Sequence, residues 1–356
     1  GDSAICAPPS WAKLFSIDCS GQVPILQTPY GSYQLETESE SESGSSQNQT
    51  SRNVKTLHLP LRNMAIMSST VIHHLEMLDA AEAIRGFDRP EHIFSPALQE
   101  RVQSGEISAI GQGDGTVNLE LLLSLNADAF ISAGINDLDN TNQILQKAGI
   151  DSISYADWQE SHPLGRAEWI IVSGILLGKA AEARQIFAEI EENYQMLQNT
   201  VRDYFEDETN SAYRPRVLIN APYGGSWGIP GGNSYAARFI QDAGGELAIQ
   251  ASEADGSDFL ALEDVYRQAA DADVWINPGR WENLTALQRD EPRLGRFRPV
   301  VEKTVYNYTG RTTEQGGMDY FESGTVRPDL VLKDLIFIFH PQLLPEHTLF
   351  YYKRID

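Results

Sequence analysis

The feature that most constrains the fold is a long run without Pro or Gly in the middle of the chain, over residues 179–207. Its larger apolar side chains recur at helical spacing along one side: Ile186, Phe187, Ile190, Tyr194, Leu197, Val201 and Tyr204. A helix of this length would extend about 40 Å, enough to lie along two lobes and join them. We therefore predict one connecting helix over 179–207. An ordinary long core helix is the alternative.

Short apolar runs alternate with helical segments on both sides of this helix. Before it, over 54–178, the segments "NMAIMSS" and "ADAFISAG" have the composition of strands and "NLELLLSL" that of a helix. After it, over 208–356, the strand "RPRVLINAP" precedes a helix with Asn233 or Ser234 as N-cap and Gly244 at its end. This alternation predicts two α/β lobes with mainly parallel sheets.

The first 53 residues do not follow this pattern. Residues 11–35 alternate loosely and turn at Ser20–Gly21, which predicts a β-hairpin extension. The segment "ETESESESGSSQNQT" (36–50) has no large apolar residue, so it is predicted to be a mobile acidic loop.

Charge and cysteine content exclude several classes of protein. There are 27 basic and 50 acidic residues, and the resulting net charge of −23 disfavours nucleic acid and anionic membrane surfaces as partners. No stretch approaches eighteen consecutive apolar residues, so no membrane-spanning helix is expected. Cys6 and Cys19 are too few for a disulfide framework or a four-cysteine zinc site. They either form a bridge in an oxidising compartment or remain thiols.

Five separated segments, taken in order, resemble the substrate-binding proteins of the iron-complex and cobalamin ABC importers. The resemblance covers about residues 54–352 and rests on "MAIMSSTVIHHLEMLDAAEAI", "IGQGDGTVNLELLLSLNADAFI", "PLGRAEWIIVSGILLGKAAEARQIFAEIEENY", "NSYAARFIQDAGGE" and "PDLVLKDLIFIFHPQLLP".

The resemblance implies a class III periplasmic-binding-protein-like fold, with two Rossmann-like lobes joined by one long helix. It also implies a monomeric, non-enzymatic protein, either periplasmic or lipid-anchored at the outer face of the cytoplasmic membrane. Such a protein would bind a ferric siderophore, haem or cobalamin between its lobes, hold no resident cofactor, and deliver its ligand to the permease subunits.

Aromatic and glycine-rich loops at the predicted strand ends supply candidate ligand-binding residues. Flat chelates favour rigid aromatic walls with a few cationic or polar groups that fix their orientation. Either Arg166 or Arg280 could meet a ligand carboxylate with paired donors. The full set of candidates is Trp158, Arg166, Tyr223, Trp227, Arg280, Trp281, Met318 and Tyr320.

The resemblance also implies permease docking through one acidic residue on each lobe. Glu76 is where the acid of the first lobe is expected. In the second lobe the matching position holds Arg238, and Asp242, one helical turn further on, is the substitute.

Two other kinds of function stay open at this stage. "GGSWG" (224–228) has the G-x-S-x-G spacing of a hydrolase nucleophile elbow, with Ser226 as nucleophile and His340 or His347 as base. However, "GIPGGN" follows, which cannot begin the helix that this motif requires. A free-metal binder or sensor of the same fold is the other alternative. His73 and His74 are adjacent, so on a helix they would point about 100° apart and not converge on one ion.

Overall fold

The computed structural model describes residues 2–37, 54–134 and 139–356. Most of the predicted acidic loop over 36–50 lies outside these residues. The chain forms two compact units and passes between them at several places, one of which lies inside the long helix. The first unit comprises Gly1–Glu160, Leu164–Glu189 and Thr313–Val326, and the second comprises Ser161–Pro163, Ile190–Thr312 and Arg327–Asp356.

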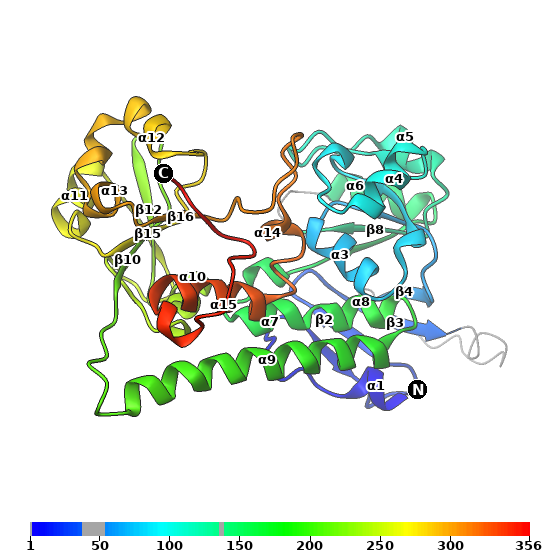
Figure 1. The fold of residues 1–356 in the computed structure, drawn as a ribbon. Coiled ribbons are helices and arrows are strands. Elements are labelled where there is room, and N and C mark those ends of the chain that lie inside the picture. Colours follow the sequence, from blue (N-terminus) through cyan, green and yellow to red (C-terminus); the bar gives the residue numbers. More distant parts are fainter. Residues whose placement is uncertain (1, 38–53, 135–138) are drawn as a thin grey trace. The chain divides into compact units, whose positions relative to one another are not determined.

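The first unit is built on a five-stranded sheet in which every strand pairs in parallel with its neighbours, in the order β7-β6-β5-β8-β9. Figure 1 labels its strand β8 and the helices α3, α4, α5 and α6 of the same unit. The strands are β5 (Met64–Ile66), β6 (Ile84–Phe87), β7 (Ser108–Ala109), β8 (Ala129–Ser132) and β9 (Asp151–Ser154). The helices of this part are α3 (Ser69–Met77), η1 (Ala81–Ala83), η2 (Pro90–His92), α4 (Pro96–Gln103), α5 (Leu119–Ser124), α6 (Asp139–Lys147), η3 (Asp157–Gln159), α7 (Pro163–Glu168), α8 (Ile170–Leu176) and α14 (Asp319–Glu322).

The N-terminal extension forms a second sheet of the first unit, with the order β1-β2-β3-β4. Its elements are α1 (Asp2–Cys6), β1 (Ser16–Asp18), β2 (Ile25–Thr28), β3 (Gly31–Thr37) and β4 (Val54–Leu59). The predicted hairpin corresponds to β1 and β2, which pair antiparallel. The parallel pairing of β3 with β4 extends it into a sheet, and both strands bury alternate apolar side chains: Tyr33 and Leu35 on β3, and Leu57 and Leu59 on β4. Cys6 and Cys19 form a disulfide bridge.

Two buried carboxylates attach the extension to the rest of the first unit. Glu168 accepts hydrogen bonds of 2.6–2.8 Å from the backbone N–H groups of residues 10–12. Glu160 accepts from residues 13–14 and from the Trp169 indole at 3.1 Å. Because bonds from several N–H groups to an ionised acceptor are strong, the extension is an integral part of this unit.

The second unit contains a sheet of order β13-β10-β15-β16-β17, in which only β17 pairs antiparallel. Its strands are β10 (Arg216–Ile219), β13 (Glu246–Leu247), β15 (Val274–Ile276), β16 (Val305–Asn307) and β17 (Lys353–Arg354). A separate antiparallel sheet consists of β11 (Pro222–Tyr223), β12 (Ser226–Pro230) and β14 (Ser257–Leu260). The helices are α10 (Tyr235–Asp242), α11 (Leu262–Ala269), α12 (Leu284–Asp290), η4 (Pro292–Arg296), α13 (Arg298–Glu302), α15 (Pro328–Phe339) and η5 (Pro341–Leu343).

The predicted connecting helix is α9, which spans Ala180–Glu206. Its buried side chains include Phe187, Ile190, Tyr194 and Val201, so the predicted apolar stripe faces the protein. The expected fold class, with mainly parallel sheets and one long helix, is confirmed. Within the described residues, no helix has both the length and the apolar character needed to cross a membrane.

Candidate functional site

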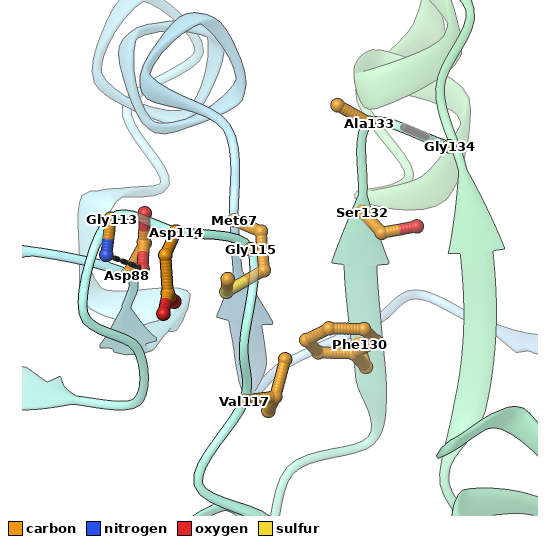
Figure 2. A pocket seen from close by; sticks show the side chains of 10 residues that line it. All are labelled: Met67, Asp88, Gly113, Asp114, Gly115, Val117, Phe130, Ser132, Ala133 and Gly134. Carbon is orange, nitrogen blue, oxygen red and sulfur yellow. Dashed lines mark hydrogen bonds between the residues drawn. The ribbon is translucent and has the colours of Figure 1, made fainter. Parts of the chain in front are cut away.

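A hollow of about 350 Å³ opens at the carboxyl ends of three neighbouring strands of the first unit (Figure 2). Met67 directly follows β5, Asp88 directly follows β6, and Ser132 is the last residue of β8. The carboxyl ends of parallel strands meet at one edge of a sheet, which is where open α/β sheets bind ligands. The remaining lining residues are Gly113, Asp114, Gly115, Val117, Phe130, Ala133 and Gly134.

Glycines allow the loop after β7 to approach Asp88. The Gly113 N–H donates to Asp88 Oδ1 at 3.0 Å, as Figure 2 shows. A Cβ atom added at Gly111 would lie 1.9 Å from Asp88 Oδ1, and Gly113 has a φ of +83°. A larger residue would clash at the first position and be strained at the second. The glycine-rich sequence "IGQGDG" therefore shapes one wall of the hollow.

A second hollow of about 280 Å³ shares Met67, Asp88 and Gly113 with the first. It is also lined by Arg89, His92 and the predicted site residue Met318, together with Ser69, Phe87, Gly316, Phe321 and Glu322. Met67, His92 and Met318 offer thioether and imidazole groups, which ligate haem iron in other proteins.

Aromatic side chains contact the rim of the first hollow. The predicted residue Trp158 is 41% exposed, and its indole Nε1 donates to the Ala133 carbonyl at 2.6 Å. Tyr30, in the turn between β2 and β3, lies so close to Gly134 that an added Cβ would be 2.4 Å from its ring. Tyr30 is not among the residues predicted from the sequence, because nothing local links the N-terminal extension to this loop.

The charges around the hollows are mixed. Thr116 donates hydrogen bonds to Asp114, and these hold the pKa of that carboxyl below its ordinary value. Arg89 Nε lies 3.1 Å from Glu91 Oε1, so part of its charge is already compensated. The first hollow thus has an apolar wall around Phe130 and the ionised carboxylate of Asp114, and the second hollow adds the guanidinium group of Arg89. A partly apolar, partly charged ligand fits such surroundings.

Two predicted residues lie at the surface of the second unit. Tyr223 is 85% exposed on β11. Arg280 is exposed, donates to the Pro222 carbonyl at 3.4 Å, and lies 4.2 Å from the centre of the Trp281 ring. A hollow of about 340 Å³ in this unit is lined by Pro222 and Arg280 but also by three carboxylates, Glu263, Asp290 and Glu291.

The structure contradicts the prediction that Trp227 and Trp281 are ligand walls. They are 0% and 1% exposed and belong to the core of the second unit. Trp227 packs against Trp275 and Phe297, and its indole donates to the Ile219 carbonyl at 2.8 Å. The glycines around Trp227 suggested an open loop. Instead the residue lies on β12, where alternation turns every second side chain inward.

Arg166 and Tyr320 are held within the first unit. Arg166 Nε donates to the Glu160 carbonyl at 3.0 Å. Burial raises the pKa of the neighbouring Asp157 to about 6, and the positive charge of Arg166 offsets part of this rise. Tyr320 is half-buried with its ring against Phe321. These contacts give both residues structural roles, and their ligand contacts stay a prediction.

Both predicted docking acids have internal partners. Glu76 accepts from Ser95 Oγ at 2.5 Å and lies 3.5 Å from His73 Nδ1, and its side chain is 21% exposed. Asp242 accepts from the Tyr194 hydroxyl at 2.7 Å, and burial raises its pKa. Arg238 is exposed. The docking assignment stays a prediction.

The hydrolase alternative is wrong. Ser226 begins strand β12, which no helix follows directly. His340 is bonded to the Gly244 carbonyl, and His347 to buried Asp334. Ser226 therefore lacks the strand-to-helix elbow geometry of a hydrolase nucleophile.

Known proteins with a related sequence or a related fold identify the family of this chain. A family profile described as periplasmic binding protein matches residues 93–312, more than half of the chain. The chain belongs to the periplasmic binding protein family.

Among curated relatives, an uncharacterized lipoprotein of Methanocaldococcus jannaschii is 23% identical to this chain over 341 residues. The match covers 93% of this chain and 76% of the relative. Another uncharacterized protein of the same organism is 22% identical, covering 80% of this chain and 83% of the relative.

Among solved structures, the periplasmic heme-binding protein HutB of Vibrio cholerae is 16% identical, with a TM-score of 0.57, over 76% of this chain and 98% of HutB. The triscatecholate siderophore binding protein FeuA of Bacillus subtilis is 18% identical, with a TM-score of 0.56, over 79% of this chain and 94% of FeuA. At these identities the likeness concerns the fold.

Proposed function

We propose that this protein is an extracytoplasmic, non-enzymatic solute-binding protein that captures an iron complex and delivers it to the permease subunits of an ABC importer. The observation that carries the proposal is the pair of connected hollows at the carboxyl ends of β5, β6 and β8, with thioether and imidazole groups among their lining residues. Family membership and the ligands named for HutB and FeuA favour haem or a ferric siderophore. Cobalamin stays the alternative chelate.

Two further observations support the extracytoplasmic location. The Cys6–Cys19 disulfide is of a kind that persists in oxidising compartments and is rare in the cytosol of mesophiles. Relatives that match most of the chain are named lipoproteins.

Substitution of Met67 tests the assignment of the hollow. Met67→Ala removes a half-buried side chain shared by both hollows, so the affinity for the cognate iron complex should fall about tenfold, or about 1.4 kcal/mol. Titrations with haemin and with a ferric triscatecholate, followed by tryptophan quenching, measure this change.

Met196→Ala is the matched control, because it makes the same substitution on α9 at a side chain that is 59% exposed. It should bind like the parent protein. If Met67→Ala also binds the complex with parental affinity while remaining folded, the ligand does not occupy these hollows.

A further inference from the structure

A cluster of metal-ligating side chains lies beside the second hollow. His73 and Glu76 are three positions apart on α3, so they share one face of the helix. Glu322 lies on α14, which packs against α3. One donor atom from each of these three side chains lies within 4.8 Å of the other two.

Glu322 is fixed in place and almost fully buried, with 2% exposed. Its two carboxylate oxygens accept from the backbone N–H groups of Phe94 at 2.6 Å and Ser95 at 3.1 Å. A carboxylate has about four acceptor positions, so these bonds orient the group and leave lone pairs for a cation. Ser95 Oγ orients Glu76 in the same way. Supporting bonds of this kind are typical of metal-ligating carboxylates.

No Arg or Lys forms an ion pair with Glu76 or Glu322 in the part of the chain that the structure describes. His73 Nδ1 lies 3.5 Å from Glu76 Oε2, so one imidazole faces the pair of carboxylates. Adjacent carboxylates out of water repel unless a proton or a cation lies between them. Buried charges in proteins are either paired or bound to metals.

The distances between the three side chains are close to those between the ligands of a bound metal ion, and the second hollow offers the ion a route of entry. Metal–nitrogen and metal–oxygen bonds of about 2.0–2.2 Å place ligand atoms about 3–4 Å apart. His73 Nδ1 and Glu76 Oε2 are already 3.5 Å apart. Glu322 and Ser69 line the second hollow, which reaches the cluster from outside.

We propose that His73, Glu76 and Glu322 bind a divalent first-row transition-metal ion such as Zn²⁺ or Co²⁺. One imidazole and two carboxylates form a donor set that suits these ions better than Mg²⁺ or Ca²⁺, which prefer oxygen ligands alone. Three protein ligands leave a coordination position open toward the hollow. This site goes beyond the proposed function, because the chain itself, and not a chelate, would hold the ion.

Cobalt absorption provides the test. Protein freed of metal with EDTA is titrated with CoCl₂, and visible absorption bands should appear and saturate at a single ion per chain. Addition of ZnCl₂ should then displace the cobalt. His73→Ala and Glu322→Gln should each weaken Co²⁺ binding about tenfold or more. His58→Ala, at a side chain that is 75% exposed on β4, is the control and should bind like the parent protein.

Circular dichroism checks that each variant is folded, because His73→Ala changes a side chain that is only 20% exposed. Absence of cobalt bands in the parent protein would overturn the proposal, and so would parental affinity in His73→Ala. Glu76→Gln tests whether this carboxylate is a metal ligand. Weakened cobalt binding supports the ion site, whereas an unchanged cobalt titration contradicts it. Met67→Ala should retain cobalt binding, so the site and the proposed function can fail separately.

Discussion

Replacement of Trp227 by Ala should lower the free energy of unfolding by about 3–5 kcal/mol. The side chain is 0% exposed, packs against Trp275 and Phe297, and donates to the Ile219 carbonyl. Its removal leaves a cavity that rigid neighbouring rings fill poorly, and also removes the hydrogen bond to the Ile219 carbonyl. Urea unfolding followed by circular dichroism measures the effect. The affinity for the iron complex should change little in the fraction that remains folded.

Tyr223→Ala is the matched control, since this residue is on the neighbouring strand β11 and is 85% exposed. It should change the free energy of unfolding by less than about 0.5 kcal/mol. If Trp227→Ala leaves stability intact and abolishes ligand binding, Trp227 is a ligand wall and the second-unit core has been misassigned.

His74→Leu should remove part of the acid sensitivity of the protein. His74 is fully buried, its Nδ1 lies 2.8 Å from Ser173 Oγ, and its Nε2 has no hydrogen-bond partner among the described residues. Burial, with a smaller contribution from His73, lowers its pKa from 6.5 to about 3. The imidazole is therefore neutral in the folded protein and becomes protonated on unfolding below pH 6.5. Its contribution to stability is fully present above pH 6.5 and is lost as the pH falls toward 3.

Between pH 7.5 and 4.5, the parent protein should lose about 2–3 kcal/mol more stability than His74→Leu does. Ser173 keeps the Tyr155 hydroxyl as a partner in the variant, so the substitution leaves no new unpaired hydroxyl. Urea unfolding at a series of pH values gives both curves. His58→Leu, at an exposed side chain, should follow the parent curve. Parallel curves for the parent and His74→Leu would show that another group causes the acid sensitivity.

The sequence was sufficient for features that depend on local patterns. Helix α9 begins and ends within a residue of the predicted bounds, because a one-sided apolar stripe without Pro or Gly specifies a long helix. Ser234 caps α10 by accepting from the Ala237 N–H, and Gly244 follows that helix with a φ of +84°. Helix caps depend on residues next to each other in the chain, so they can be predicted from the sequence.

The candidate site was harder to predict because it depends on tertiary contacts. Met67 and Asp88 follow two separate strands, and only the sheet order makes them neighbours. Tyr30 comes from the N-terminal extension, and no local pattern links that extension to the loop at Gly134. The sequence predicts only that the adjacent pair His73 and His74 does not converge on one ion. The actual partners of His73 are Glu76, three residues on, and Glu322, which no local pattern links to α3.

The most direct test of the proposed function is a ligand panel with the parent protein. Haemin, a ferric triscatecholate and cobalamin are each added at a hundredfold excess over the dissociation constant measured by tryptophan quenching. A ligand that binds only the folded state should raise the free energy of unfolding by about 2.7 kcal/mol under these conditions. We predict saturable quenching and this stabilisation with haemin or with the ferric triscatecholate. No quenching and no shift in the unfolding curve with either iron complex would contradict the proposal.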